Sequence, residues 1–242
     1  MANRLVAALN HADRANLLSN AKLLDVPVAR SLGFAGKPLE YAWFPTTCII
    51  SILSKPVDCP SFDVGMIGYE GVFSAGCAQG VSASAFDAVV TSEGQAWRVS
   101  AHDLACHERS SAALSALLSR FMSVELAQLG LLVACGRYHS LVQRLSRYLL
   151  MSQDRLRAPD ILITQHALAA VLGERRRASV TVAAGYLQDL GFIRYSRGHI
   201  LVLNRNGLID MTCACYEQGW ALYKSLMEEP TSELQQVESS EK

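Results

Sequence analysis

A long apolar segment that follows Ser110 constrains the fold more than any other part of the chain. In and beside it, only Arg109, Arg120 and Glu125 are charged. Its apolar residues recur near helical spacing, and they are Leu114, Leu117, Leu118, Phe121, Val124, Leu126, Leu129, Leu132 and Val133. A helix this long, with apolar residues around much of its circumference, needs more surface to pack against than one sheet provides. We therefore predict a dimerisation helix over residues 109–137 and a homodimer.

The part of the chain that precedes the long apolar segment is predicted to begin with a shorter helix and to continue with short strands. Leucines near helical spacing predict a helix over residues 4–24. From Tyr41 onward, β-rich runs alternate with proline and glycine turns, and the runs are 41–44, 48–53, 62–67, 85–90 and 95–99. Strands this short, with turns this dense, indicate an antiparallel sandwich or barrel. The chain is therefore predicted to be α+β, with an N-terminal β domain.

Helices return after the long apolar segment. A second helix is predicted from Leu141 to Asp154, and Ala158-Pro159 ends it. Its inward residues are expected to be Leu141, Val142, Leu145, Leu149 and Leu150, and its outward residues Gln143, Arg144 and Arg147. The last residues, 228–242, are acidic and polar, which predicts a disordered tail.

Residues 164–203 carry a dense series of local signals. Thr164 resembles the N-cap of a short helix that ends at Gly173, and a longer helix then runs to Leu190 and ends at Gly191. Alternation around Ser196-Arg197-Gly198 indicates a β-hairpin. Two helices, a tight glycine turn and a hairpin tipped with arginine are the layout of a winged helix-turn-helix.

Charge is distributed unevenly along a chain that is neutral overall, with 22 basic and 22 acidic residues. Residues 135–205 contain eleven arginines against four acidic residues, which gives this block a net charge of +7. Arginine binds phosphate groups and guanine edges through its planar fork of donors. The excess therefore indicates a surface for double-stranded DNA, with a solvated helical surface as the alternative.

The second helix of the pair is the predicted reader of DNA. Its polar leading end holds Arg175, Arg176, Arg177, Ser179 and Thr181, whereas Val180, Ala184, Leu187 and Leu190 are expected to face inward. We assign Arg177, Arg176 and Ser179 to base contacts. We assign the contacts with the DNA backbone to Thr164, Gln165, Thr181, Arg194 and Arg197.

These segments resemble Crp/Fnr-type bacterial transcription regulators. The resemblance rests on residues 164–173, 176–181 and 190–198, on a front half in which 41–46 and 64–73 are similar to the family's sensor β-roll, and on the link at 135–150. It implies a jelly-roll-like, cyclic-nucleotide-binding-like sensor domain over residues 1–108 and a winged helix-turn-helix domain over 138–227. It also implies a homodimer that reads a two-fold symmetric promoter site, with RNA polymerase as a candidate partner.

The recognition helix departs from the family pattern at three positions. Glu174 looks like an insertion in the turn, while Arg177 matches the arginine that contacts guanine in many relatives. Ala178 stands where a glutamate is common, and Val182 stands where an arginine is common. The target DNA sequence of this chain therefore cannot be inferred from the targets of other family members.

The family's cyclic-nucleotide cassette is incomplete. Glu70-Gly71 fits the glutamate position, but no lysine or arginine occurs between Gly71 and Trp97 to neutralise a phosphate. We therefore predict that cyclic AMP is not bound and that Glu70 is a structural residue at a helix start. The effector stays unknown.

No other sensor chemistry has a signature in the chain. An amino-terminal iron–sulfur cluster is excluded because the first cysteine is Cys48, and His102 or His107 is interpreted as a cap or surface residue rather than a haem ligand. Cys213 and Cys215 are interpreted as buried cysteines, since two thiols lack the remaining ligands of a site. We therefore predict no metal and no cofactor.

Two functions other than a regulator are alternatives for a chain of this organisation. A β-roll enzyme would need several histidine or carboxylate ligands on its strands, yet no histidine occurs between His11 and His102, so no catalytic residue is assigned. A sensor and dimerisation protein that has lost DNA binding is the remaining alternative. No uninterrupted apolar run approaches the length of a membrane span and no signal peptide is evident, so we expect a cytoplasmic protein.

Overall fold

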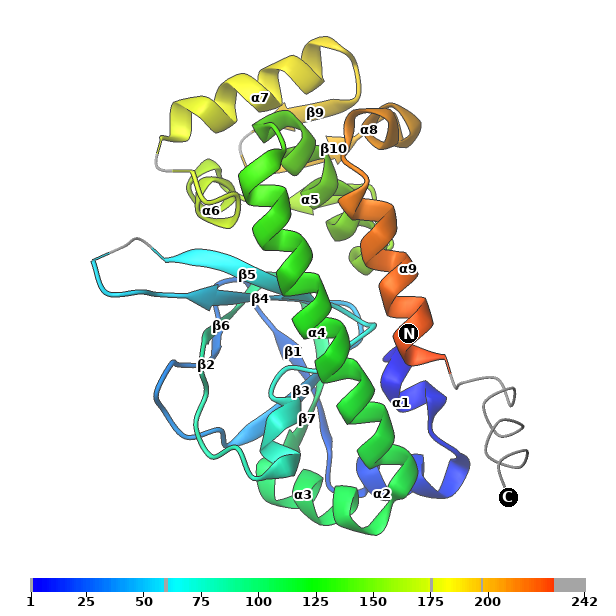
Figure 1. Ribbon diagram of the computed structural model, residues 1–242. Coiled ribbons are helices and arrows are strands. Elements are labelled where there is room, and N and C mark those ends of the chain that lie inside the picture. The colour runs from blue at the N-terminus through cyan, green and yellow to red at the C-terminus, as the bar shows by residue number, and fades with distance from the viewer. Residues whose placement is uncertain (1, 59–60, 175, 197, 229–242) are drawn as a thin grey trace, which may run out of the picture.

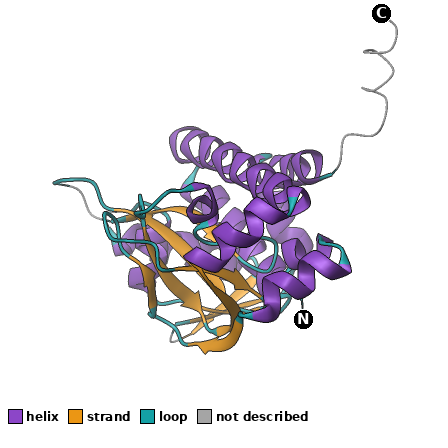
Figure 2. Ribbon diagram, turned by 90° about the horizontal axis from the view of Figure 1, so that it is seen from below, coloured by secondary structure: helices purple, strands orange, loops and turns teal. Residues whose placement is uncertain are grey.

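The computed structural model describes residues 2–58, 61–174, 176–196 and 198–228. A β domain and a small helical domain lie at opposite ends of one long helix, α4 (Ala112–Tyr138) (Figure 1). Seen from below, helices gather on one side of the sheets (Figure 2). The predicted order of a β domain, a long helix and a helix-turn-helix domain is confirmed.

The amino terminus is not the single helix that the leucine pattern predicted. Helices α1 (Arg4–Ala8) and α2 (His11–Ser19) end before β1 (Lys22–Val26). Asn3 and Asn10 cap the two helices, and Leu23 and Leu24 pair with β7 instead of extending the helix. Pairing with a strand more than 70 residues away overrides the local spacing of the leucines.

Two antiparallel sheets form the β domain. One sheet has the order β1-β7-β3, with β3 (Tyr41–Pro45) and β7 (Gly94–Ser100). The other has the order β2-β6-β4-β5, with β2 (Ser31–Gly33), β4 (Ile49–Ser54), β5 (Phe62–Ile67) and β6 (Asp87–Ser92). Alternation and turn signals predicted β3 to β7 correctly, but neither β1 nor β2. A short 3₁₀ helix, η1 (Ala75–Gln79), lies between β5 and β6.

One non-helical residue, Ser111, separates helix α4 from the helix before it. Helix α3 (Ala101–Ser110) stops at Ser111, whose hydroxyl oxygen accepts a hydrogen bond from the amide of Leu114 at 3.1 Å. The first half of α4 is buried through Leu114, Leu118 and Phe121, while Leu126 and Val133 in the second half are 72% and 66% exposed. Within the described residues, α4 is the one helix long and apolar enough to span a membrane by length and composition. It packs against α9 (Cys215–Met227) and β5.

The second domain follows directly on α4. It contains α5 (Leu141–Leu156), β8 (Asp160–Leu162), α6 (Gln165–Val171), α7 (Arg177–Asp189), β9 (Ile193–Ser196), β10 (His199–Val202) and α8 (Arg205–Met211). The hairpin of β9 and β10 is as predicted, and β8 adds a third strand to it. Helix α9 then returns along α4 toward the β domain (Figure 1). Apart from Glu228, the predicted disordered tail lies outside the described residues.

The two domains share packing at their boundary. Ile49 of β4 and Met66 of β5 belong to the same buried apolar cluster as Leu149 of α5 and Leu187 of α7. The hydroxyl of Tyr223 on α9 donates a hydrogen bond of 2.9 Å to the carbonyl oxygen of Glu70. The helical domain is thus held against the β domain as well as against α4.

Candidate nucleic-acid interface

Helices α6 and α7 form the predicted helix-turn-helix. The hydroxyl oxygen of Thr164 accepts a hydrogen bond of 3.1 Å from the amide of Ala167, so Thr164 is the N-cap of α6 as predicted. Gly173 has a φ of +66°, a left-handed conformation that glycine adopts without strain. The amide of Glu174 then donates to the carbonyl of Ala169 at 2.8 Å, which closes the turn.

The residue that looked inserted has a defined partner. A carboxylate oxygen of Glu174 lies 2.6 Å from a terminal guanidinium nitrogen of Arg144 on α5. The other terminal nitrogen of Arg144 donates to the carbonyl of Leu172 at 2.7 Å. These contacts of Arg144 join the turn to α5, so Glu174 helps to hold the turn in place.

Helix α7 has one buried face and one exposed face. Val180, Ala183, Ala184 and Leu187 are buried, which confirms the inward residues except Leu190. Leu190 is 42% exposed because it caps the helix instead of completing its buried face. Figure 1 shows α7 at the end of the molecule farthest from α3. Its position leaves the exposed face open to a large partner.

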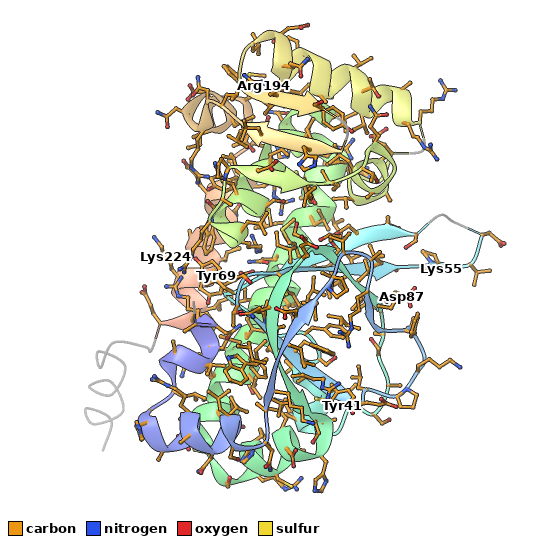
Figure 3. All side chains as sticks on the ribbon, turned by 180° about the vertical axis from the view of Figure 1, so that it is seen from behind. Tyr41, Lys55, Tyr69, Asp87, Arg194 and Lys224 are labelled. Atoms are coloured by element: carbon orange, nitrogen blue, oxygen red, sulfur yellow. The ribbon has the colours of Figure 1, made fainter. Side chains whose placement is uncertain are left out.

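The predicted DNA contacts fall on this end of the molecule. Arg176, Arg177 and Thr181 are exposed, and Ser179 is half-buried at the start of α7. Thr164 and Gln165 are exposed where α6 begins. Arg194 is exposed on β9, the strand that follows α7 (Figure 3). Arg175 and Arg197 lie outside the described residues.

The hydroxyl of Thr181 is partly committed within the helix. It donates a hydrogen bond of 3.1 Å to the carbonyl of Arg177. Its oxygen can still accept, whereas the guanidinium groups of Arg176 and Arg177 supply donors only. Donors for phosphate oxygens and guanine edges therefore concentrate at the first turn of α7.

Several arginines of the basic block are not available to DNA, contrary to the outward positions predicted for Arg144 and Arg147. Arg147 is only 7% exposed and Arg144 is paired with Glu174. Arg155 is 3% exposed, and Arg205 forms an ion pair of 2.7 Å with Asp154. Helical spacing alone did not reveal these roles, because the ion pairs of Arg144 and Arg205 each join α5 to another part of the chain.

The cassette residue Glu70 is structural, but it does not begin a helix. It lies in the turn after β5, 2% exposed, with one carboxylate oxygen 2.7 Å from Nε of Arg155. The amide of Gly68 donates to the same oxygen at 3.1 Å. At Gly71, a Cβ atom would collide with the ring of Phe121 on α4. Contacts within the chain thus occupy the cassette.

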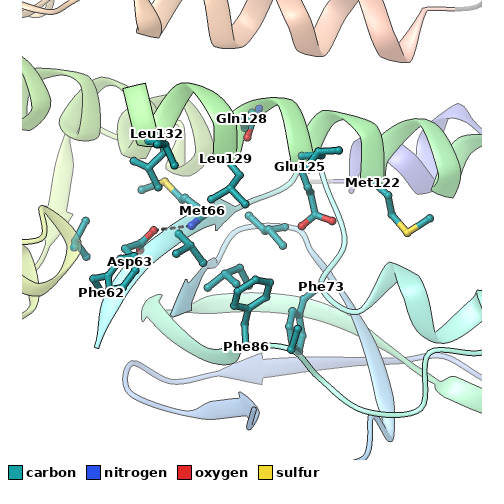
Figure 4. Close-up of a pocket in the computed structure, with 18 of the residues that line it drawn as sticks. Phe62, Asp63, Met66, Phe73, Phe86, Met122, Glu125, Gln128, Leu129 and Leu132 are labelled. Carbon is teal, nitrogen blue, oxygen red and sulfur yellow. Dashed lines mark hydrogen bonds between the residues drawn. The ribbon is translucent and has the colours of Figure 1, made fainter. Parts of the chain in front are cut away.

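A cavity of about 760 Å³ lies between the β domain, α4, α5 and the turn that follows α6 (Figure 4). Its wall is mostly apolar, and Figure 4 shows Met66, Phe73, Phe86 and Leu129 around it. The side chain of Glu125 points into it from α4. Burial, with the nearby charge of Glu70 as a second cause, raises the pKa of Glu125 to about 8.

Comparison with known proteins identifies the helical domain. Residues 143–211 match the model of the Crp-like helix-turn-helix domain. No curated protein matches the chain by sequence. Solved structures of similar fold include proteins described as transcriptional regulators.

FixK2 from Bradyrhizobium japonicum superposes with a TM-score of 0.66 at 15% identity, over 80% of this chain and 98% of that one. The c-di-GMP responsive global regulator CLP from Xanthomonas campestris superposes with a TM-score of 0.61 at 14% identity, over 80% of this chain and 99% of that one. A CRP-family transcriptional regulator from Thermus thermophilus superposes with a TM-score of 0.62 at 13% identity, over 78% of this chain and 95% of that one.

The match over residues 143–211 places a Crp-like helix-turn-helix domain at the end of the long helix. The whole chain shares its fold with solved structures of the Crp/Fnr family.

Proposed function

We propose that this chain regulates transcription as a cytoplasmic homodimer that binds a two-fold symmetric promoter site through the first turn of α7. The observation that carries the proposal is the pair Arg176 and Arg177, which are exposed at the start of a helix whose opposite face is buried. Such a helix fits a major groove about 12 Å wide, and a bidentate arginine reads guanine there. Thr164, Gln165 and Arg194 would contact the flanking phosphates, and Arg175 and Arg197 extend this assignment.

The second half of α4 supports the homodimer. Leu126 and Val133 expose large apolar side chains on a helix that the β domain covers only in its first half. A second copy would bury these residues and place two α7 helices on one face of DNA, as half-sites about one turn apart require. RNA polymerase is a candidate partner at such a promoter.

Cyclic AMP is not the effector in this proposal. The glutamate of the cassette already pairs with Arg155, and the cavity beside it presents the carboxyl group of Glu125 to any anion. A phosphate placed there would lack a neutralising arginine from the segment 71–97. We therefore expect millimolar cyclic AMP to leave the melting temperature unchanged within about 1 °C, and a rise of several degrees would refute this part of the proposal.

The decisive experiment is selection of bound fragments from sheared genomic DNA at physiological salt with excess competitor. The proposal predicts enrichment of a palindromic motif by the wild-type chain and its loss in Arg176→Ala with Arg177→Ala. Lys22→Ala with Lys37→Ala is the matched control, because it removes two exposed charges from the β domain. Specific binding that survives in the arginine variant would overturn the proposal.

The alternative is a dimerisation protein that no longer reads DNA sequence. It is favoured by Ala178 and by Val182, which is 73% exposed where many relatives have a base-reading arginine. In that case the wild-type chain enriches no motif, and its affinity for DNA is equally weak for all sequences.

A further inference from the structure

Four potential metal ligands meet where α4 joins the helical domain. They are Cys135 in the last turn of α4, His139 at its C-cap, and Cys213 and Cys215 at the start of α9. Their sulfur and ring nitrogen atoms all lie within 4.8 Å of one another. Among the described residues, this is the group of histidine, cysteine and acidic side chains arranged to hold a metal ion.

In the sequence, Cys213 and Cys215 stand without the two further ligands that a metal site needs. The fold supplies these ligands as Cys135 and His139. Cys135 is 78 residues from Cys213, and His139 is 76 residues from Cys215. Helix α9 packs along α4, which brings the Cys-x-Cys pair back to a Cys-x-x-x-His pair. The reason for rejecting a site there, that two thiols have no further ligands, therefore does not hold.

The distances in the cluster agree with tetrahedral coordination. The sulfur atoms of Cys135 and Cys213 are 3.6 Å apart, and the sulfur of Cys215 is 3.6 Å from Nδ1 of His139. Zinc bound at about 2.3 Å from sulfur and about 2.05 Å from nitrogen separates two sulfurs by about 3.8 Å and a sulfur from a nitrogen by about 3.6 Å. A disulfide would require sulfurs about 2.05 Å apart.

We propose that Cys135, His139, Cys213 and Cys215 bind one zinc ion per chain as a closed, structural Cys₃His site. Four protein ligands leave no open position for a substrate, which distinguishes a structural zinc site from a catalytic one. The three cysteines are 0–6% exposed, so the site is shielded from water. Zinc is the metal that such a mixed thiolate and imidazole set prefers in tetrahedral geometry.

A buried arginine is placed to balance the charge of the site. Three thiolates and one Zn²⁺ ion leave a net charge of −1. The guanidinium of Arg147, which is 7% exposed, acts electrostatically on both Cys135 and Cys215. The guanidinium of Arg147 can therefore offset the net negative charge of a site that holds zinc and three thiolates.

The position of the site gives zinc a mechanical role. Cys135 and His139 flank the last turn of α4, immediately before α5 begins. Cys213 lies in the connection between α8 and α9, and Cys215 is the first residue of α9. One ion would fasten this connection to the joint between α4 and the helical domain, and so fix the direction in which α7 is presented.

Metal content of the purified full chain tests the proposal without DNA. We expect one zinc per chain by mass spectrometry of the metal, and replacement by Co²⁺ should give a sulfur-to-cobalt charge-transfer band with the strong visible absorption of tetrahedral cobalt. In Cys213→Ser and His139→Gln, zinc affinity should fall by more than about tenfold.

Cys106→Ser is the matched control, because Cys106 lies on α3 outside the cluster and should leave the zinc content at one. Circular dichroism of His139→Gln shows whether a loss of zinc reflects a lost ligand or an unfolded chain. Zinc far below one per chain in the folded wild-type protein, with no charge-transfer band after cobalt is added, would overturn the proposal. A Cys135–Cys213 disulfide found by mass spectrometry under non-reducing conditions would overturn it as well.

Discussion

Glu70 and Arg155 form an ion pair with a carboxylate oxygen 2.7 Å from Nε, and both side chains are at most 3% exposed. Glu70 follows β5 of the β domain, and Arg155 lies in the last turn of α5. The pair therefore joins the turn after β5 to the end of α5 in the helical domain. The glutamate of the incomplete cassette is used here for a contact between domains.

Loss of one partner of this pair should be costly. Glu70→Gln or Arg155→Met should each lower the free energy of unfolding by about 3 to 5 kcal/mol, because each leaves a buried charge uncompensated. The double variant should lose less than the sum of the two. Urea unfolding of all four proteins measures this coupling. His199→Ala is the control, since its exposed contact with Asp160 should contribute less than about 1 kcal/mol. Additive losses would show that the two side chains stabilise the fold independently.

Two arginines of the interface should differ in what they contribute to DNA binding. Arg177→Ala should lower the preference for the cognate site by about 1 to 3 kcal/mol, because it removes a base contact. Arg194→Ala should weaken binding to all sequences alike and reduce the slope of log affinity against log salt by about 1. Titrations of a cognate and a scrambled duplex at several salt concentrations separate the two effects. Equal loss of specificity in both variants would contradict the assigned roles.

A charge on the second half of α4 should dissociate the dimer. Leu126→Glu should weaken the association by about 2 kcal/mol or more, since the carboxylate would be buried without a partner. Sedimentation at a series of concentrations gives the dissociation constant. Val57→Glu is the matched control, because Val57 is 87% exposed in a loop of the β domain. A Leu126→Glu protein that stays dimeric would show that this surface is not the interface.

Buried Asp63 should make stability depend on pH. Burial raises the pKa of Asp63 to about 7, although hydrogen bonds from Ser51 and Gly65 and the charges of Arg147 and Arg155 oppose the rise. The unfolded chain releases this proton near pH 4 while the folded chain retains it, so stability decreases as pH rises from about 4 to about 7. The contribution at its steepest is about 1.4 kcal/mol per pH unit.

Asp63→Asn tests this directly, because the amide stays neutral and its oxygen can still accept the hydrogen bond from the amide of Gly65. Urea unfolding at pH 5, 6, 7 and 8 should show a shallower decrease for the variant than for the wild-type chain. Asp87→Asn, at a half-buried position on β6, provides the comparison. Parallel curves for Asp63→Asn and the wild type would place the pH dependence elsewhere, with Glu125 the next candidate.

The helix-turn-helix could be predicted from the sequence because its signals are local. Thr164 caps the helix that begins one residue later, and Gly173 and Gly191 adopt the positive φ values that turns and helix ends require. Such preferences act within a few residues, so the sequence alone determined the two helices, the hairpin and the exposed arginines of α7. The short strands between turns were determined in the same way.

Tertiary structure decided which charges and thiols meet. Arg155 is 85 residues from Glu70, and Cys135 is 78 residues from Cys213, so no spacing in the sequence reveals either contact. It also made a strand of Lys22–Val26, through pairing with β7, where leucine spacing predicted a helix. The physical reason is that burial and long-range pairing depend on how the elements pack, whereas caps and turns depend only on neighbouring residues.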